Sequence, residues 1–376
     1  MSNSKTSLTV STERRRREPL TDTNLLLIIT ICIFFGMYGL AMMIWGGGFR
    51  NPQQFIDIFN SNAFLIIISC GLTIVMIGGG IDISVGGVTA MVNMSCAVFL
   101  NGDNGSLLGS MCLALGIGIA FGLVQGYLVA YLEIQPFIIS LAGMFFARGM
   151  TTIISPVPVT VAHEGFKAFR EIRIEIPWEF LGTYGKTGNF ISARIEQQAI
   201  IALVVVAAVF VILKWSKTGR NFYAIGGNKQ SALTLGINVK RTRFYAHLLC
   251  GLLAGVAGFT YLMRAGAANA AGDAYIAEMK AIASSIIGGT LLTGGVGNVI
   301  GTLFGVLTLM TINSIVVTSG LKDPWWQSIT TGSMLCVFIL LQSVVLALRG
   351  KSDFKLALPS WLKFKSEKIS DGENIG

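Results

Sequence analysis

The chain has 376 residues, of which 53% are hydrophobic and only 12% are charged, and its formal net charge is +9. Soluble domains carry roughly 25% charged residues, so this composition excludes an ordinary water-soluble enzyme and indicates an integral membrane protein. The charges cluster at the two ends and in two interior stretches. The apolar blocks between them are about 20 residues long, which is the length that crosses a bilayer core.

Ten membrane-spanning helices are predicted from the apolar runs and from the turn and charge signals between them. The predicted fold is all-α, a polytopic integral membrane helical bundle with one transmembrane domain over residues 25–348. The second and third runs share a junction, so nine or eleven helices also fit. The ten runs are 25–45, 62–81, 84–101, 107–132, 136–156, 198–216, 244–264, 276–293, 298–319 and 325–348.

The amino-terminal segment, residues 1–24, is polar and contains four consecutive arginines at 14–17, and we expect it to be a disordered basic tail. The run 25–45 exceeds the roughly 7–15-residue core of a signal peptide and lacks a small-residue cleavage site. The arginines place the amino terminus in the cytoplasm by the positive-inside rule. Ten helices then place the carboxyl-terminal tail, residues 349–376, in the cytoplasm as well.

Two long loops differ in charge. The loop 217–243 carries six Lys and Arg residues and no acid, whereas the loop 157–197 balances five bases with five acids. The same count places the first loop in the cytoplasm and the second in the periplasm, as the positive-inside rule requires. The net charge therefore reflects topology and attraction to the anionic lipid bilayer, and it requires no nucleic-acid partner.

No catalytic set is recognisable. The six cysteines lie in apolar runs without CxxC pairs, and the histidines, His163 and His247, lack companions at metal-ligand spacing. The stretch "GTYGKTG" (182–188) is not a phosphate loop, because Phe180 stands where the motif needs its first glycine. We expect no metal, no cofactor and no nucleotide site in this chain.

The stretch "IGGGIDISVGG" (77–87) places Asp82 and Ser84 between two apolar runs, beside a glycine triplet. The triplet is expected to break the second helix, and Asp82 or Ser84 can accept unpaired amide protons at the start of the next helix. Broken helices in transporters also expose backbone groups to a water-filled path. A cap at this break can therefore line a solute path as well.

Other polar residues within the runs are uncharged, among them Asn93, Gln125, Asn313 and Gln342. Neutral donors and acceptors suit an uncharged, polyhydroxylated solute, and an ion-driven carrier more often has several intramembrane carboxylates or histidines. The same amides can serve as hydrogen-bonding contacts between helices. Small residues at 116–126, 251–258 and 288–305 predict close helix packing.

The basic loop 217–243 contains a Gly-Gly-Asn turn at 226–228, followed by "KQSALTLGI", which predicts a short helix ended by Gly236. Its apolar residues include Ala232, Leu233 and Leu235. An amphipathic helix held by turns on the inner surface is suited to dock on a soluble partner. An ordinary charged loop is the alternative.

Four ordered stretches resemble the membrane permease subunits of bacterial ATP-binding-cassette (ABC) importers for monosaccharides, the ribose-type family. The resemblance covers roughly residues 25–348, and "LAGMFFARG" with the paired Trp325 and Trp326 is similar to the permease of the galactofuranose importer. The four stretches are "VMIGGGIDISVGGVTAM" (75–91), "QPFIISLAGMFFARGM" (135–150), "TGRNFYAIGGNKQSALTLGINV" (218–239) and "AIASSIIGGTLLTGGVGNVIGTLFG" (281–305).

The resemblance implies a permease that translocates a monosaccharide, such as galactofuranose or ribose, across the bacterial inner membrane and is not itself an enzyme. It implies three protein partners: cytoplasmic ABC ATPase subunits, a second permease chain that is identical or different, and a periplasmic sugar-binding protein. A branched-chain amino-acid ABC permease, an ion-coupled secondary sugar carrier and a passive channel are the rival interpretations.

The polar pattern and the resemblance together give the candidate functional residues. Glu278 is a candidate at the outer end of its helix, and Lys280 departs from the family, which usually has an acid there. The candidates for the substrate path are Asp82, Ser84, Asn93, Gln125, Phe137 and Asn313. The candidates for the ATPase-coupling loop are Ala224, Ile225, Gly226, Gly227, Asn228, Ala232, Leu235 and Gly236.

Overall fold

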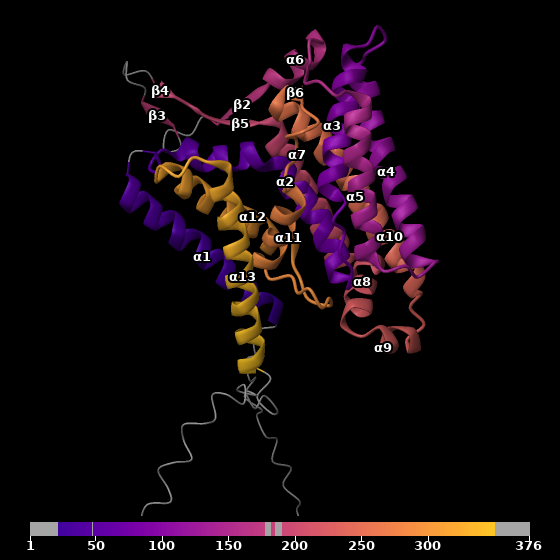
Figure 1. Cartoon of the computed structure of the whole chain (residues 1–376). Coiled ribbons are helices and arrows are strands. Elements are labelled where there is room, and N and C mark those ends of the chain that lie inside the picture. Colours follow the sequence, from indigo (N-terminus) through magenta and orange to yellow (C-terminus); the bar gives the residue numbers. More distant parts are fainter. Residues whose placement is uncertain (1–21, 47, 177–181, 185–189, 350–376) are drawn as a thin grey trace, which may run out of the picture. The chain divides into compact units, whose positions relative to one another are not determined.

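The computed structural model describes residues 22–46, 48–176, 182–184 and 190–349. Most of the predicted tails, 1–24 and 349–376, therefore lies outside the described residues. The chain divides into two units, residues 1–335 and 336–376. The long helices (Figure 1) are α1 (Asp22–Trp45), α2 (Pro52–Ile77), α3 (Val85–Asn101), α4 (Leu107–Ala130), α5 (Pro136–Ile154), α7 (Gln197–Trp215), α10 (Val239–Ala265), α12 (Val299–Thr318) and α13 (Pro324–Arg349).

The shorter helices are α6 (Glu164–Glu171), α8 (Lys217–Gly227), α9 (Lys229–Thr234) and α11 (Ala277–Ile287). Among the described residues, eight helices are long and apolar enough to cross a membrane: α1, α2, α4, α5, α7, α10, α12 and α13. Helix α3 is apolar but has only 17 residues. The fold is a polytopic helical membrane protein, and each of the ten predicted runs contains one helix.

Three predicted boundaries are wrong. The run 62–81 starts ten residues earlier, at Pro52, because α2 continues through a kink at Asn62. The run 244–264 starts at Val239, since Asn238 caps α10 before the apolar part begins. In the run 276–293, α11 has only 11 residues, about 16 Å at 1.5 Å per residue, which is half of a bilayer core.

The glycine triplet breaks the second helix as predicted. Helix α2 ends at Ile77 and α3 begins at Val85. Gly79 has a φ of 78°, which L side chains rarely adopt, and the Gly80 amide donates to the Val75 carbonyl at 3.0 Å. The chain therefore turns sharply between the two helices.

Close packing through small residues is confirmed for α4 and α10. A Cβ atom added at Gly122 would lie 2.9 Å from the Leu248 Cα atom, and one added at Gly251 would lie 2.6 Å from the Gly122 Cα atom. The two backbones are thus in direct contact. Helices α11 and α12 also approach closely. A Cβ atom added at Gly305 in α12 would lie 2.8 Å from the Gly288 amide nitrogen at the end of α11.

Helix α1 lies against the end of α11. The Thr30 hydroxyl donates to the Ile287 carbonyl at 2.7 Å. A Cβ atom added at Gly289, whose φ is 87°, would lie 2.8 Å from the Leu26 Cβ atom. The first helix therefore covers the point at which α11 stops.

The predicted periplasmic loop 157–197 contains structure that the sequence did not predict. Strand β2 (Arg173–Ile176) pairs antiparallel with β5 (Ala193–Glu196). Strand β1 (Val159–Thr160) pairs with β6 (Ala267–Ala268), and β3 (Thr183–Tyr184) pairs with β4 (Phe190–Ile191). The Asn60 side chain in α2 accepts the Glu196 amide at 3.0 Å and so attaches the loop to the helices.

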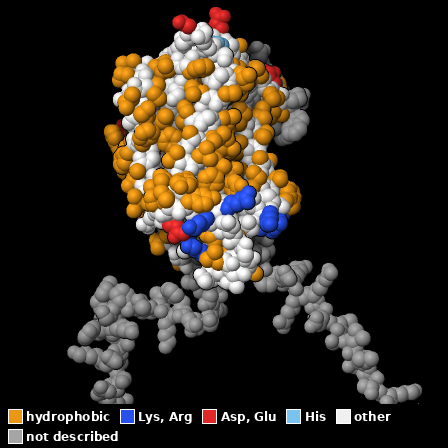
Figure 2. Space-filling model, turned by 90° about the vertical axis from the view of Figure 1, so that its right-hand side faces the viewer, with side chains coloured by type: hydrophobic (Ala, Val, Ile, Leu, Met, Phe, Trp, Pro, Cys, Tyr) orange, Lys and Arg blue, Asp and Glu red, His pale blue; other side chains and the backbone are white. Residues whose placement is uncertain are grey.

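The exposed surface has the pattern of a lipid-facing protein. Figure 2 shows one face on which hydrophobic side chains form a broad band, with Lys and Arg side chains gathered below it. Large exposed apolar residues on α4 and α5 include Leu108, Val124, Phe145 and Ile153. Such a band is stable only in contact with lipid tails or partner helices.

Candidate functional site

Three glycine-containing segments meet backbone to backbone at the break between α2 and α3. They are Gly78–Gly80 at the break, Gly226–Gly227 at the end of α8, and Gly294–Gly295 in the loop before α12. A Cβ atom at Gly294 would lie 2.8 Å from the Gly79 Cα atom, and one at Gly295 would lie 2.6 Å from the Gly227 Cα atom. We call this contact the glycine junction. A side chain at Gly226, Gly294 or Gly295 would collide with this backbone, whereas a Cβ atom at Gly227 would meet nothing within 4 Å.

Hydrogen bonds join the same three segments. The Gly295 amide donates to the Ile77 carbonyl at 2.9 Å. The Tyr223 hydroxyl in α8 donates to the Gly297 carbonyl at 2.9 Å, and burial raises the pKa of Tyr223 to about 12. Helix α8 is therefore attached both to the broken helix and to the loop before α12.

Helices α8 and α9 lie in residues 217–236, which we call the coupling segment after the role predicted for it. The turn predicted at 226–228 is wrong for Gly226 and Gly227, which lie in the last turn of α8. The turn occurs at Asn228, whose side chain accepts the Ser231 amide at 2.9 Å and caps α9. The short helix ends before Gly236, which has a φ of 76°, as the sequence predicted.

Some apolar residues in and just after the coupling segment are buried, and others are exposed. Ile225, Ala232 and Val239 form a buried cluster, against which Ala224 and Ile237 pack. In contrast, Leu233 is 47% exposed and Leu235 is 78% exposed. The buried residues hold α8, α9 and the start of α10 together, and the exposed leucines are available to a partner.

Asp82 is buried at the start of α3, with 2% of its surface exposed. Its Oδ1 atom accepts the Ser84 amide at 2.9 Å and lies 2.6 Å from the Ser84 hydroxyl. That hydroxyl is also 3.3 Å from Gln125 Oε1, and Asp82 Oδ2 lies 3.7 Å from His247 Nδ1. Asp82 thus bonds Ser84, the residue just before α3, but neither side chain accepts a first-turn amide of α3, so the predicted helix cap is wrong in this form. Ser84 connects the break to α4, and Asp82 connects it to α10.

The structure does not bring all the path candidates together. Asp82, Ser84 and Gln125 meet, but Asn93 is further along α3, where its amide donates to Asp273 at 2.6 Å. Phe137 is the second residue of α5 and is 48% exposed. Asn313 is buried in α12, and neither polar atom of its amide has a hydrogen-bond partner among the described residues.

The segment between α10 and α11, residues 266–276, is held by a network that the sequence did not predict. The Arg148 guanidinium donates to the Asp273 and Ala274 carbonyls at 2.6 and 2.7 Å. Ala274 and Ile276 have φ values of 48° and 57°, which side-chain-bearing residues adopt only when their surroundings enforce it. Burial raises the pKa of the Asp273 carboxyl, although amide donors from Asn269 and Asn93 oppose the shift.

Glu278 follows this segment at the start of α11. It lies 3.7 Å from the Arg148 guanidinium, and its carboxyl group packs over Gly86, where any Cβ atom would collide with it. Gly86, in the glycine pair that ends the stretch 77–87, thus makes room for Glu278. The spacing of 192 residues between them hides this contact from sequence reasoning.

A cavity of about 640 Å³ opens beside residues 272–277, and we call it the outer cavity after the periplasmic side predicted for it. Four aromatic residues, Phe64, Tyr261, Tyr275 and Trp325, contribute to its lining together with the polar Asn62, Lys280 and Gln327. Aromatic faces with amide and ammonium donors can stack on and hydrogen-bond a hydroxyl-rich solute. Within the described ranges, no three His, Cys, Asp or Glu side chains are placed to hold a metal ion.

Residues 54–339 match the family described as branched-chain amino acid transport system / permease component. The inner membrane ABC transporter permease protein YjfF of Escherichia coli is 36% identical over 319 residues, which cover 85% of this chain and 92% of that protein. The fructose import permease protein FruG of Bifidobacterium longum is 36% identical over 325 residues, covering 86% and 92%.

The ribose import permease protein RbsC of Escherichia coli is 31% identical over 299 residues, covering 78% of this chain and 87% of that protein. No solved structure matches the chain. The family match extends over the broken helix, the coupling segment and the loop before α12. The chain therefore belongs to the family of multi-pass inner-membrane permease subunits of ABC importers that includes the ribose permeases.

Proposed function

We propose that this chain forms the membrane path of an ABC importer for a monosaccharide and is moved by separate cytoplasmic ATPase subunits. The glycine junction is the observation that carries the proposal. It joins the coupling segment to the broken helix by direct backbone contact. A force applied to α8 and α9 therefore acts on the break without flexible side chains between them.

The exposed Leu233 and Leu235 are the docking points that we assign to an ATPase subunit. Closure of the ATPases on ATP moves these leucines, and the buried cluster around Ala232 makes α8 and α9 move together. Motion of α8 displaces Gly295 and the end of α2, and so alters the packing around Asp82. ATP drives this change only because docking stabilises one arrangement more than the other.

The substrate class follows from the relatives and from the outer cavity. Two of the relatives above are named as fructose and ribose permeases. The family description also names branched-chain amino acids, but a zwitterion needs both a cationic and an anionic partner. The outer cavity, whose lining lies within the described residues, offers Lys280 and no carboxylate. A monosaccharide that stacks on Trp325 or Tyr275 is the better fit.

Two further partners complete the proposal. A second permease chain, identical or different, forms the other wall of the path, because the apolar faces of single helices such as α4 and α5 are extensively exposed. A periplasmic sugar-binding protein delivers the sugar to the outer cavity. Galactofuranose and ribose are the sugars to test first.

Uptake of radiolabelled sugar into vesicles that contain the permease, the ATPase and the binding protein tests the function. We expect uptake to require ATP and all three components. Uptake driven by a proton or sodium gradient without the ATPase would contradict the proposal and favour a secondary carrier.

A further inference from the structure

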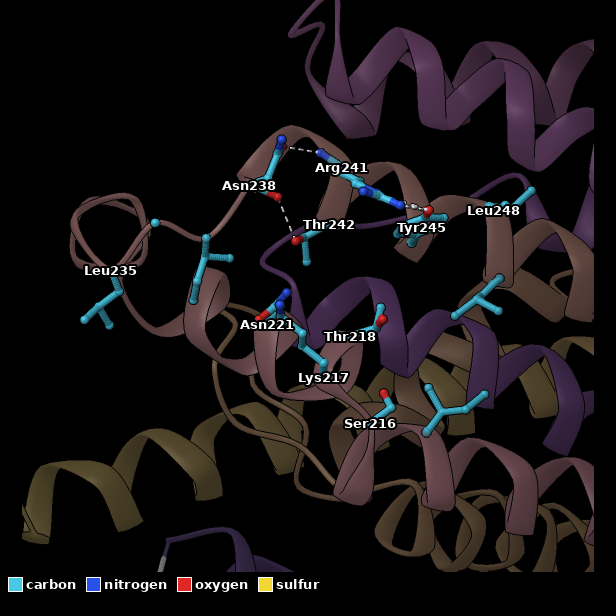
Figure 3. A pocket seen from close by; sticks show the side chains of 14 residues that line it. Ser216, Lys217, Thr218, Asn221, Leu235, Asn238, Arg241, Thr242, Tyr245 and Leu248 are labelled. Atoms are coloured by element: carbon cyan, nitrogen blue, oxygen red, sulfur yellow. Dashed lines mark hydrogen bonds between the residues drawn. The ribbon is translucent and has the colours of Figure 1, made fainter.

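A groove of about 820 Å³ opens between the end of α7, the start of α8 and the first turns of α10, and Figure 3 shows its lining side chains. Lys217 and Arg241 are its two cations, and Ile212, Leu248 and Leu249 are among its apolar residues. Of the fourteen residues that line it, all within the described part of the chain, none is acidic. The groove is therefore both cationic and apolar.

Its polar and apolar parts are separated along one helix. Arg241, Tyr245 and Leu248 recur at three- to four-residue spacing and so share one face of α10. Seven residues of helix correspond to about 10 Å. Ile212 extends the apolar part from the membrane-spanning α7, and Lys217 extends the polar part from the first residue of α8.

The two cations are not neutralised by acids. Among the described residues, neither Lys217 nor Arg241 forms an ion pair. Arg241 donates from Nε and Nη2 to the Tyr245 hydroxyl at 3.2 and 3.0 Å, which fixes the guanidinium without cancelling its charge. The neighbouring Lys240, which does not line the groove, is paired with Glu133 at 3.1 Å.

The starts of two helices add to this positive field. Helix α8 has 11 residues and α10 has 27, and both begin at the groove. The Ser216 and Asn238 side chains accept one amide each, from Gly219 and Arg241. The other first-turn amides have no partner within their own helices and favour a nearby anion.

The groove lies at the boundary between membrane-spanning and polar structure. Trp215 ends α7, is 62% exposed, and has the Lys214 ammonium 5.7 Å from its ring. Exposed tryptophan beside cationic residues is typical of the level of lipid headgroups. Basic pockets between membrane helices at this level recognise acidic lipid headgroups.

We propose that this groove binds an anionic phospholipid, such as phosphatidylglycerol, from the leaflet next to the coupling segment. The lipid phosphate lies between Lys217 and Arg241, and the first part of an acyl chain lies along Ile212, Leu248 and Leu249. Charge complementarity selects an anion, and the apolar lining continuous with two membrane helices selects a lipid over a soluble anion. Because α8 borders the groove, the lipid would also restrain the coupling segment.

Native mass spectrometry of the purified full-length chain in neutral detergent tests this proposal. The chain is titrated with phosphatidylglycerol, with phosphatidylcholine as the neutral lipid and glycerol phosphate as the soluble competitor. The variants are Lys217→Gln, Arg241→Gln, their combination, and the charge-conserving pair Lys217→Arg with Arg241→Lys. Lys240→Gln is the matched control, because it removes the same charge one residue away, outside the groove.

We expect the affinity for phosphatidylglycerol to fall about fivefold for each Gln substitution at Lys217 or Arg241 and about thirtyfold for both, since each cation near a lipid surface contributes about 1 kcal/mol. The charge-conserving pair and Lys240→Gln should bind within about twofold of the parent chain. These results together support the proposal.

Four results overturn it. An equal loss in Lys240→Gln and Arg241→Gln would indicate diffuse surface charge. Equal binding of phosphatidylcholine would exclude headgroup recognition. Displacement of phosphatidylglycerol by an equal concentration of glycerol phosphate would indicate a site for soluble anions. Loss of ATPase binding in the double Gln variant, with lipid binding unchanged, would assign the groove to the ATPase instead.

Discussion

The Gly295 amide donates to the Ile77 carbonyl at 2.9 Å, so the loop before α12 is bonded to the last residue of α2. Ile77 is the point at which the second helix stops, and its carbonyl would otherwise be an unsatisfied acceptor. The bond places Gly226 of α8 directly against both residues. Three segments that are distant in sequence thus form one mechanical unit.

The first prediction concerns Gly226. A Cβ atom there collides with the Ile77 carbonyl oxygen, whereas one at Gly227 meets nothing within 4 Å. We expect Gly226→Ala to lower ATP-driven uptake at least about fivefold, because crowding at a packed contact costs about 1–3 kcal/mol. Gly227→Ala, the matched control in the same helical turn, should transport normally. Equal uptake by the two variants, at equal membrane levels, would show that the junction does not transmit motion.

The second prediction concerns Asp82. Replacement by Ala leaves the Ser84 amide and hydroxyl without this acceptor in a buried site, at a cost of about 1–3 kcal/mol. Asn retains an acceptor oxygen, so Asp82→Asn should keep more uptake and a higher melting temperature than Asp82→Ala. Uptake and thermal unfolding of both variants check this order. If Ala and Asn behave alike, the hydrogen bonds to Ser84 are unimportant.

The third prediction concerns the contact between α4 and α10. Gly122 lies against the Leu248 backbone, whereas Gly116 in the same helix is exposed and has free space around it. Gly122→Ala should lower the melting temperature by several degrees, for a cost of about 1–3 kcal/mol. Gly116→Ala should leave it unchanged or raise it, because Ala favours helix by about 1 kcal/mol over Gly. A similar fall in both variants would contradict the close approach of these helices.

The fourth prediction concerns Arg148. Its planar guanidinium donates to two carbonyls at once, a geometry that a lysine ammonium does not reproduce. In Arg148→Lys, amide hydrogen exchange in residues 266–276 should become about tenfold faster, which corresponds to losing one hydrogen bond of about 1.5 kcal/mol. Arg50→Lys, at an exposed position, is the control. Unchanged exchange in the Arg148 variant would mean that other contacts hold the segment.

Much of the helical fold could be predicted, because a long apolar run in a bilayer must satisfy its backbone internally and therefore forms a helix. The glycine triplet at 78–80 likewise predicted the break. The half-length of α11 could not be predicted. A spanning helix and an irregular segment covered by protein can have the same apolar composition. The structure shows the irregular segment through features such as Gly289, whose φ is 87°.

The site was less predictable, because its contacts join residues far apart in the sequence. The sequence pattern indicated Asp82 and the resemblance indicated Glu278, but neither showed that Glu278 packs on Gly86 or that Arg148 holds a residue 125 positions away. Tyr223 was missed because a tyrosine in a basic loop carries no pattern of its own. The short helix before Gly236 was predicted, since its cap and its terminating glycine are local signals.

Helix α11 ends at Ile287, which is 1% exposed, so its last carbonyls need partners within the protein, and α1 provides one of them. The Thr30 hydroxyl bonds the Ile287 carbonyl, and Leu26 seals Gly289. Helix α1 thus covers irregular backbone, in addition to being long enough to cross a membrane. A shortened chain that begins at α2 would leave the Ile287 carbonyl and the backbone at Gly289 without the contacts of α1. It should therefore be unstable in the bilayer even though every other helix is present.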